Sequence, residues 1–250
     1  LYYENNMGSL VSILKCVKEF NIPHVVFSSS CTVYGNPDRF PVTETTSLQQ
    51  AVSPYGATKQ MGEQILCDFA SASNTRVILL RYFNPVGAHP SCLIGELPLG
   101  KPQNLVPVIT QTAIGKLPKM MVYGSDYQTR DGSCIRDYIH VSDIAHAHTL
   151  AVDYLRADKN QNTCEVFNLG TGNGITVLEA IHTFEKVSGQ QLNYEIGPRR
   201  PGDIEAIYAN NEKATQQLGW TIRYNLDQMM QTAWAWEQKI KKEEDSISKN

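Results

Sequence analysis

The sequence has no CxxC pair, no cluster of histidine and cysteine, and no long apolar run. Metal sites depend on such spacings, so we predict no metal. A membrane-spanning helix needs about 20 apolar residues in succession. The six cysteines are scattered, which predicts free thiols in a reducing cytoplasm. A net charge of −3 gives no reason to expect nucleic-acid or membrane-surface binding.

The sequence also lacks a glycine-rich dinucleotide fingerprint. Its one glycine-rich run between a predicted strand and a predicted helix is Gly170-Thr-Gly172-Asn-Gly174, which does not have the GxGxxG order. We therefore interpret it as a structural turn. The first residue is Leu1 rather than Met. We expect that an opening strand, a glycine-rich turn and a crossover helix precede this residue in the native protein.

What remains has the composition of a soluble globular protein. Of the 250 residues, 42% are hydrophobic and 19% are charged. This length is enough for one large domain or two small ones.

The stretch from Phe27 to Lys59 carries the strongest chemical signal. An apolar run, His24–Phe27, ends in three serines, as a buried parallel strand does at the carboxyl edge of its sheet. Ligands of open α/β sheets bind at that edge. A helix predicted from Pro54 to about Ala72 then places Tyr55 and Lys59 one turn apart on the same face.

A phenol beside an ammonium group is a recognisable general base. The positive charge of Lys59 should favour the phenolate and lower the pKa of Tyr55, and a base works best with its pKa near the operating pH. Ser30 can hydrogen-bond the same substrate oxygen. A YxxxK spacing alone is typical of many surface helices. The serine-ended strand and the proline at the helix start favour the catalytic interpretation.

Several motifs resemble those of one family. Ser-Ser-Ser followed by Tyr-x-x-x-Lys resembles the extended short-chain dehydrogenase/reductases. Seven stretches narrow the likeness to the UDP-glucose 4-epimerases: SSSCTVYGNP, SPYGATK, LLRYFNPVGAHPS, NLVPVITQTAIGK, DGSCIRDYIHVSDIA, FNLGTGNGITVLE and RRPGDIEAIYAN. The resemblance runs from Tyr2 to about Trp236.

The resemblance implies an α/β fold, with a partial doubly wound, Rossmann-like parallel sheet and a smaller α/β substrate-binding cap. Residues 1–84 would form the carboxyl-side half of the NAD-binding domain and hold the catalytic residues. Residues 85–250 would form mainly the cap, with segments that return to the sheet. The edge of the sheet near Val25–Phe27 would be left open.

The resemblance also implies the reaction, NAD-dependent interconversion of UDP-glucose and UDP-galactose in the cytoplasm by a homodimer, with UDP-N-acetyl sugars as further possible substrates. The implied catalytic residues are Ser30, Tyr55 and Lys59. The implied cofactor-binding residues are Asn5, Ser30, Tyr55, Lys59 and Phe83. The implied substrate-binding residues are Ser30, Asn84, Asn104, Leu105, Met121, Val122, Tyr123, Arg136, Arg200, Asp203 and Ile207.

Several of these residues also have ordinary structural interpretations. Asn5 and Asn104 are good helix N-caps. Arg136 can form a local ion pair with Asp137, the arginine of the RRPGD turn can be a solvated surface residue, and Ile207 can belong to the core.

Other functions stay open. A nucleotide-sugar 4,6-dehydratase would have an Asp-Glu pair after the serines, where this chain has Cys31-Thr32. A UDP-glucuronate decarboxylase or epimerase would need a cationic pocket for the sugar carboxylate, which the FNPVGAHPS loop does not suggest. A non-catalytic remnant would still bind a UDP-sugar or a partner protein without NAD, although Ser30, Tyr55 and Lys59 are intact.

The remaining elements follow from apolar periodicity and turn residues. We expect helices at residues 5–20, 105–116, 142–156 and 177–188 and from residue 225, the last fraying into a charged tail. We expect strands at 77–80 and 165–169, two strands around a polar hairpin at 120–123 and 135–140, and a long functional loop at 85–103.

Overall fold

Three strands rich in valine, leucine and phenylalanine pair in parallel and form the main sheet, in the order β1-β2-β7. The strands are β1 (His24–Ser30), β2 (Arg76–Tyr82) and β7 (Cys164–Leu169). The three serines belong to β1 and end it, as the sequence predicts for a serine-ended strand. Ser28 to Ser30 pair with Leu80 to Tyr82 of β2, which extends the ladder to the carboxyl edge.

The computed structural model describes residues 1–247 and divides the chain into two compact units. Unit 1 consists of Leu1–Phe83, Ile144–Gly172 and Ile207–Thr221. Unit 2 consists of Asn84–Asp143, Asn173–Ala206 and Ile222–Asn250. Each unit is therefore assembled from three separate stretches of chain.

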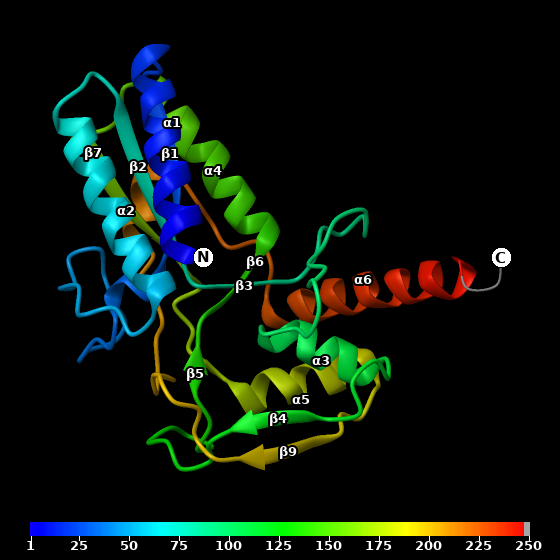
Figure 1. Cartoon of the computed structure of the whole chain (residues 1–250). Helices are drawn as coiled ribbons and strands as arrows, with labels where there is room; N and C mark the ends of the chain where they lie inside the picture. Colours follow the sequence, from blue (N-terminus) through cyan, green and yellow to red (C-terminus); the bar gives the residue numbers. More distant parts are fainter. Residues whose placement is uncertain (248–250) are drawn as a thin grey trace. The chain divides into compact units, whose positions relative to one another are not determined.

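Helices lie along the sheet of unit 1 (Figure 1). The main ones are α1 (Gly8–Glu19), α2 (Pro54–Ser71) and α4 (Val141–Arg156). Leucines of α1 and α2 pack on Val77 and Leu79 of β2. Side chains alternate along a strand, so Ile78 and Leu80, both fully buried, face the opposite side of the sheet.

Shorter helical turns complete unit 1. They are η1 (Tyr3–Met7), η2 (Cys31–Tyr34) and η3 (Ala214–Leu218). The first helix was expected to begin at Asn5 with an asparagine cap, which is wrong because the residues around Asn5 form a π-helical turn without a side-chain cap. Asn6 instead donates a hydrogen bond to Thr58 Oγ1 at 2.8 Å, which ties this turn to α2.

A disulfide joins α2 to the sheet. Cys67 and Cys164 are bonded, with their Cα atoms 5.3 Å apart. The prediction of six free thiols is therefore wrong for this pair, and the other four cysteines are thiols. The two bonded residues are 97 positions apart in the sequence, so no local spacing marks them.

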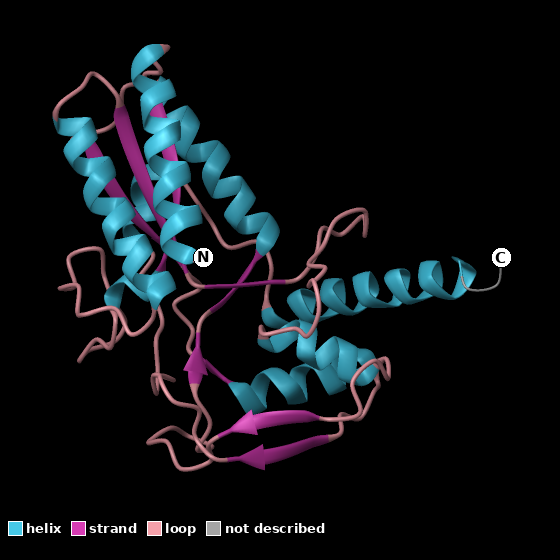
Figure 2. Ribbon diagram, in the orientation of Figure 1, coloured by secondary structure: helices cyan, strands magenta, loops and turns pink. Residues whose placement is uncertain are grey.

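Unit 2 contains three short two-stranded sheets and three helices (Figure 2). The strands are β3 (Asn84–Val86), β4 (Met120–Tyr123), β5 (Ile135–Arg136), β6 (Tyr138–His140), β8 (Ile175–Thr176) and β9 (Tyr194–Gly197). The helices are α3 (Leu105–Ala113), α5 (Val177–Ser188) and α6 (Leu226–Ile247). No helix in residues 1–247 is long and apolar enough to cross a membrane.

The expected hairpin in unit 2 does not form. Strand β4 pairs in parallel with β9, β5 pairs with β8, and β6 pairs with β3. The polar segment between β4 and β5 looked like a turn, but each strand finds its partner elsewhere in the chain. Helix α6 also continues to Ile247 through the charged segment expected to fray, with residues 248–250 outside the described part.

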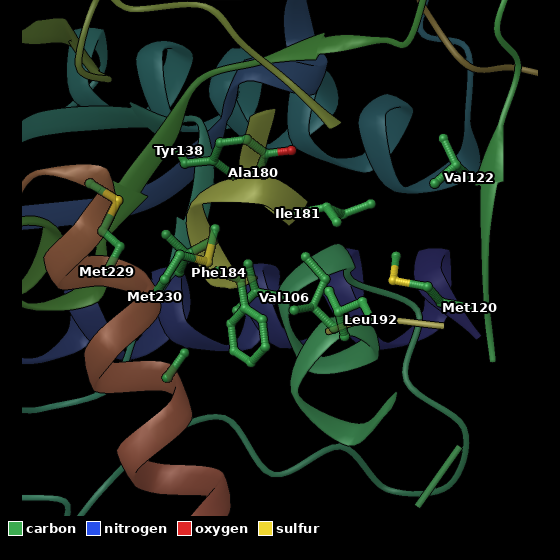
Figure 3. Packing of buried hydrophobic residues seen from close by; sticks show 13 residues of the cluster. Val106, Met120, Val122, Tyr138, Ala180, Ile181, Phe184, Leu192, Met229 and Met230 are labelled. Atoms are coloured by element: carbon green, nitrogen blue, oxygen red, sulfur yellow. The ribbon is translucent and has the colours of Figure 1, made fainter. Parts of the chain in front are cut away.

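The core of unit 2 lies between α3, α5, α6 and β4 (Figure 3). Phe184 and Ile181 of α5 are fully buried in it, together with Met230 of α6. Helix α5 begins with a reciprocal capping box, in which Thr176 and Glu179 bond each other's backbone N–H groups. This local signal explains why the predicted bounds of α5 match the observed ones.

Candidate active site

Ser30 and Tyr55 are brought together at the carboxyl end of β1. Ser53 caps α2 by accepting a hydrogen bond from Gly56 N at 3.1 Å, and Pro54 occupies the first turn. This start directs Tyr55 toward the strand end, where the Ser30 hydroxyl is a polar neighbour of the phenol. Tyr55 is half-buried and Ser30 is buried. The two predicted residues thus lie at the same strand end.

Lys59 lies one turn further along the same face of α2. Its Nζ donates a hydrogen bond to the Ser28 carbonyl at 2.8 Å and lies 5.5 Å from the centre of the Tyr55 ring. An ammonium group has three N–H donors. Among the described residues, the Lys59 ammonium group makes only this one hydrogen bond. The group can therefore donate further hydrogen bonds to a ligand at the strand end.

The electrostatics of Tyr55 differ from the expectation. Burial raises the pKa of the Tyr55 phenol, and the side chain of Ser30 opposes this effect. Burial likewise lowers the pKa of Lys59, while the charge of Glu63 opposes that shift. The expectation that Lys59 lowers the pKa of Tyr55 is therefore not met here, because desolvation of the phenol outweighs the other influences.

A cavity of about 640 Å³ lies within unit 2. It is bordered by the start of α3, by β4, by β5 and β6, and by the turn before Asp203. Eight predicted substrate-binding residues line this cavity, namely Asn84, Asn104, Leu105, Met121, Tyr123, Arg136, Arg200 and Asp203. Val122 points instead into the core of the unit, as the alternation along β4 requires.

Two polar atoms at this cavity are buried without a hydrogen-bond partner among the described residues. They are Oδ1 of Asn84 and the hydroxyl of Tyr138. A buried polar group without a partner costs about 1–3 kcal/mol. Such groups at the wall of a cavity indicate that a polar ligand completes their bonding.

Two arginines and an aspartate converge at the cavity. Arg136 donates to the carbonyls of Ile135 and Ile204 at 2.8 and 2.9 Å, and its Nη2 lies 3.7 Å from Asp203 Oδ1. The alternative interpretation, an ion pair of Arg136 with Asp137, is wrong. Neighbouring side chains of an extended segment point to opposite sides, and the carboxylate that pairs with Arg136 is that of Asp203. Arg200 also pairs with Asp203, at 2.8 Å, and stacks over Tyr123.

The start of α3 provides free backbone donors. Asn104 occupies the N-cap position, but its side chain makes no capping bond and donates to Glu96 Oε1 at 2.7 Å instead. The capping interpretation of its side chain is therefore wrong. Pro107 has no N–H group, but the N–H groups of Leu105 and Val106 at the start of the helix have no intrahelical partners, and such groups attract anions.

The other predicted site residues are placed as follows. Asn5 is exposed, and its carbonyl accepts a bond from Ser9 Oγ. Phe83 and Ile207 are buried in unit 1, with 2% and 3% of their surfaces exposed. The residues that sequence reasoning missed are Lys101, Lys119 and Tyr138, which also line the cavity. Tyr138 was detectable, because it follows Arg136 by two positions in an extended segment and so faces the same side.

Parallel strands with a serine at one strand end and a Tyr-x-x-x-Lys helix define the short-chain dehydrogenase/reductase class. Comparisons with known proteins identify the family within this class. The profile of the family described as GDP-mannose 4,6 dehydratase matches residues 1–233. A UDP-glucose 4-epimerase of Arabidopsis thaliana is 47% identical over 237 residues, which are 94% of this chain and 67% of the relative. A UDP-glucose 4-epimerase of Cyamopsis tetragonoloba is 46% identical over 94% of this chain and 66% of its own length.

Solved structures agree. The UDP-glucose 4-epimerase of Stenotrophomonas maltophila, with bound NAD and formylated UDP-arabinopyranose, superposes with a TM-score of 0.93 at 45% identity, over 96% of this chain and 71% of that one. The UDP-glucose 4-epimerase of Bifidobacterium longum, in complex with NAD+ and UDP, superposes with a TM-score of 0.90 at 46% identity, over 95% of this chain and 70% of that one. The chain belongs to the UDP-glucose 4-epimerase family. It spans about two thirds of the length of its curated relatives.

Proposed function

We propose that this chain carries the catalytic residues and the nucleotide site of an NAD-dependent UDP-glucose 4-epimerase. The observation that carries the proposal is that Ser30, Tyr55 and Lys59 meet at the carboxyl end of β1, with the Lys59 ammonium 5.5 Å from the centre of the Tyr55 ring. The chain has Cys31-Thr32 where a dehydratase would have an acidic pair, which favours epimerisation over dehydration.

Each of the three side chains has a distinct role in the proposed reaction. Tyr55 Oη accepts the proton from the C4 hydroxyl of the sugar and later returns it, which is general acid–base catalysis. Ser30 Oγ hydrogen-bonds the same oxygen and orients it. Lys59, anchored by the Ser28 carbonyl, keeps a positive charge near the phenol and stabilises the phenolate that forms.

The residues at this strand end fit a nicotinamide cofactor. Lys59 has N–H donors left for ribose hydroxyls, and Phe83 and Asn5 are the further residues that we propose to hold NAD. When bound, NAD would supply the acceptor for the C4 hydride, and epimerisation would require the 4-keto sugar to turn over so that the hydride returns to its opposite face. Among residues 1–247, no group of three or more metal-ligating side chains lies close enough to hold a metal ion.

The cavity of unit 2 fits a uridine diphosphate. Arg136 and Arg200 supply planar guanidinium groups that match phosphate oxygens, and the start of α3 adds backbone donors. The unpartnered Asn84 and Tyr138 supply further polar contacts. Both carboxylate oxygens of Asp203 accept from Arg200, and a carboxylate oxygen can accept a further hydrogen bond, here from a ribose hydroxyl. Binding energy from the nucleotide would hold the substrate while the sugar reacts.

The test of the activity uses the full-length protein with UDP-galactose as substrate. Tyr55→Phe should lower kcat by roughly 10²–10⁴-fold, because it removes the base and keeps the ring. UDP binding, measured by calorimetry, should not change. The matched control is Tyr2→Phe, whose ring packs edge-on against Tyr55 at 5.8 Å, and which should stay active. Near-normal turnover by folded Tyr55→Phe would show that another group is the base.

We propose that Ile207 limits the size of the sugar. In the family, this position lines the pocket beside the C2 substituent, and isoleucine is shorter than tyrosine but stiff at Cβ. UDP-galactose should therefore be used well and UDP-N-acetylgalactosamine more weakly. Ile207→Cys should move the ratio of kcat/KM toward the N-acetyl sugar, by roughly tenfold, and Ile207→Tyr should move it away. Equal ratios in the three proteins would assign Ile207 to the core alone.

We propose a homodimer formed through α1 and α2. Val11, Ile13 and Met61 are exposed apolar residues on these two helices, at 43%, 55% and 46%. Light scattering on the full-length protein should give twice the chain mass, and Ile13→Asp should give the monomer. A wild-type monomer at micromolar concentration would contradict the proposal.

We propose a cytoplasmic location, where NAD-linked sugar metabolism takes place. Cys16, Cys92 and Cys134 as thiols agree with it, whereas the Cys67–Cys164 bond does not. Alkylation of the protein in freshly lysed cells, followed by mass spectrometry, counts the thiols directly. Six alkylated cysteines would support the reducing compartment, and a preserved Cys67–Cys164 bond would oppose it.

A further inference from the structure

A buried ion pair lies next to Lys59, on the side of α2 that also carries Tyr55. Glu63, one turn after Lys59, accepts two hydrogen bonds from Arg81 of β2, at 2.9 Å from Nε and 2.6 Å from Nη2. Their side chains are only 6% and 5% exposed. Removing two charges from water costs several kcal/mol per ion, and apolar residues of similar volume would often be at least as stable. The pair therefore calls for an explanation other than stability.

The ion pair belongs to a wider buried network. Ser29 Oγ donates to Glu63 Oε1. Arg81 Nη1 donates to the hydroxyl of Tyr34 at 3.1 Å, and that hydroxyl donates to Asn168 Oδ1 at 2.7 Å. The network thus joins α2 to β1, β2, η2 and β7. Each of these contacts lies within unit 1.

The contact with Ser29 ties this network to the reacting side chains. Ser28, one residue before, supplies the carbonyl that anchors Lys59, and Ser30, one residue after, is the polar neighbour of the Tyr55 phenol. We propose that Glu63 and Arg81 are positioning residues, which clamp the end of β1 against α2 so that Ser30, Tyr55 and Lys59 keep their productive geometry. This inference rests on the proposed epimerase function.

The charges around the site give the proposal a measurable signature. Glu63 is the charged group whose field opposes the effect of burial on the pKa of Lys59. Tyr55 is influenced in addition by the neighbouring Tyr2, Cys31 and Tyr82. Removing the carboxylate would leave the guanidinium of Arg81 without its counter-ion, and this added positive field would favour the phenolate.

Two variants test the clamp in the full-length enzyme. Glu63→Gln keeps the shape and part of the hydrogen bonding but removes the charge. Its kcat should fall by roughly 10²-fold with little change in KM, because a small misplacement of reacting groups is enough for that loss. The pH at which Tyr55 ionises should move downward. Ser29→Ala keeps the ion pair and cuts only the link to β1, so kcat should fall about tenfold in a stable protein.

The ionisation of Tyr55 is measured without relying on activity. The ultraviolet phenolate titration of each protein minus that of its Tyr55→Phe counterpart isolates this one phenol. A wild-type protein without turnover would defeat the proposed function, while the titration would still test the clamp. The matched control is Glu237→Gln, a buried glutamate of unit 2 that is ion-paired with Lys116 at 3.0 Å. It should lower stability and leave the Tyr55 titration unchanged.

The expected pattern is that Tyr55 ionises at a lower pH in Glu63→Gln and that kcat falls in both variants. A merely structural role would not produce this combination. If Glu63→Gln does not fold, Ser29→Ala alone decides the question through kcat. Wild-type kcat and an unchanged titration in the folded variants would overturn the proposal and leave Glu63 and Arg81 as parts of the core.

Discussion

The buried polar groups next to the proposed base in unit 1 and those at the cavity of unit 2 differ in their hydrogen bonding. In unit 1, Ser29, Glu63, Arg81 and Tyr34 bond one another behind the proposed base. At the cavity of unit 2, Asn84 Oδ1 and the Tyr138 hydroxyl are buried without partners. Groups that do chemistry gain from being held in place before the substrate arrives. Groups that bind a ligand must keep hydrogen bonds for it. The comparison agrees with the proposed assignment of the chemistry to unit 1 and of nucleotide binding to unit 2.

The largest effect should follow from removing the ammonium group in unit 1. Lys59→Met keeps most of the apolar stem but loses the charge beside Tyr55, so kcat should fall by roughly 10²–10⁴-fold. Affinity for UDP, which we propose to bind at the cavity of unit 2, should not change. Turnover and UDP calorimetry on the same protein check both statements. A loss of UDP affinity as large as the loss of kcat would contradict the proposal that unit 1 carries the catalytic residues and unit 2 the UDP site.

The next effect is a loss of folding stability at acidic pH, which we expect to arise from a buried histidine of unit 2. His140 is fully buried, stacks on Tyr224 at 3.9 Å and accepts a hydrogen bond from Ser142 N at 3.0 Å. Burial, followed by the charge of His89, lowers the pKa of His140 to about 4. The unfolded chain takes up this proton near pH 6.5. Stability is therefore complete above about pH 6.5 and falls by up to about 3 kcal/mol as the pH drops toward 4.

Denaturant unfolding at a series of pH values tests this statement. His140→Gln should flatten the decline between pH 6.5 and 4. His182→Gln, at an exposed position on α5, should leave the decline in place. An identical pH dependence of wild type and His140→Gln would show that other groups cause the acid sensitivity.

A smaller effect is expected at the arginines of the cavity. Arg136→Met should weaken UDP binding by roughly 10–100-fold, because a hydrogen bond to a charged group is worth about 1.5–3 kcal/mol. The kcat at saturating substrate should stay close to wild type. Arg130→Met is the control, since Arg130 is exposed and pairs with Glu179 outside the cavity lining. Equal loss in both variants would indicate a general charge effect.

The smallest effect sharpens the comparison most directly. Tyr138→Phe removes a hydroxyl that has no partner in the described residues, so the protein without ligand should be as stable as wild type or more stable by about 1 kcal/mol. UDP affinity should fall several-fold. Thermal unfolding with and without UDP measures both quantities. A destabilised ligand-free protein would mean that the hydroxyl already has a structural role.

Much of the local structure of the candidate active site could be predicted because its signals are local. The spacing of Tyr55 and Lys59 puts them on one face of any helix, and Pro54 marks where that helix starts. The Thr176–Glu179 capping box sets the start of α5 within a few residues. Alternation along the extended segment relates Arg136 to Tyr138. Such features depend on backbone geometry over one or two turns, so the amino-acid order alone determines them.

Only the tertiary structure decided the long-range partners. Cys164 bonds Cys67 from 97 positions away, Asp203 rather than the adjacent Asp137 approaches Arg136, and β4 pairs with β9 instead of turning back as a hairpin. The pKa of Tyr55 also reversed the expectation, because burial of the phenol could not be seen in the spacing of Lys59. Contacts between distant segments and the desolvation of a side chain are properties of the packed chain, and no local pattern specifies them.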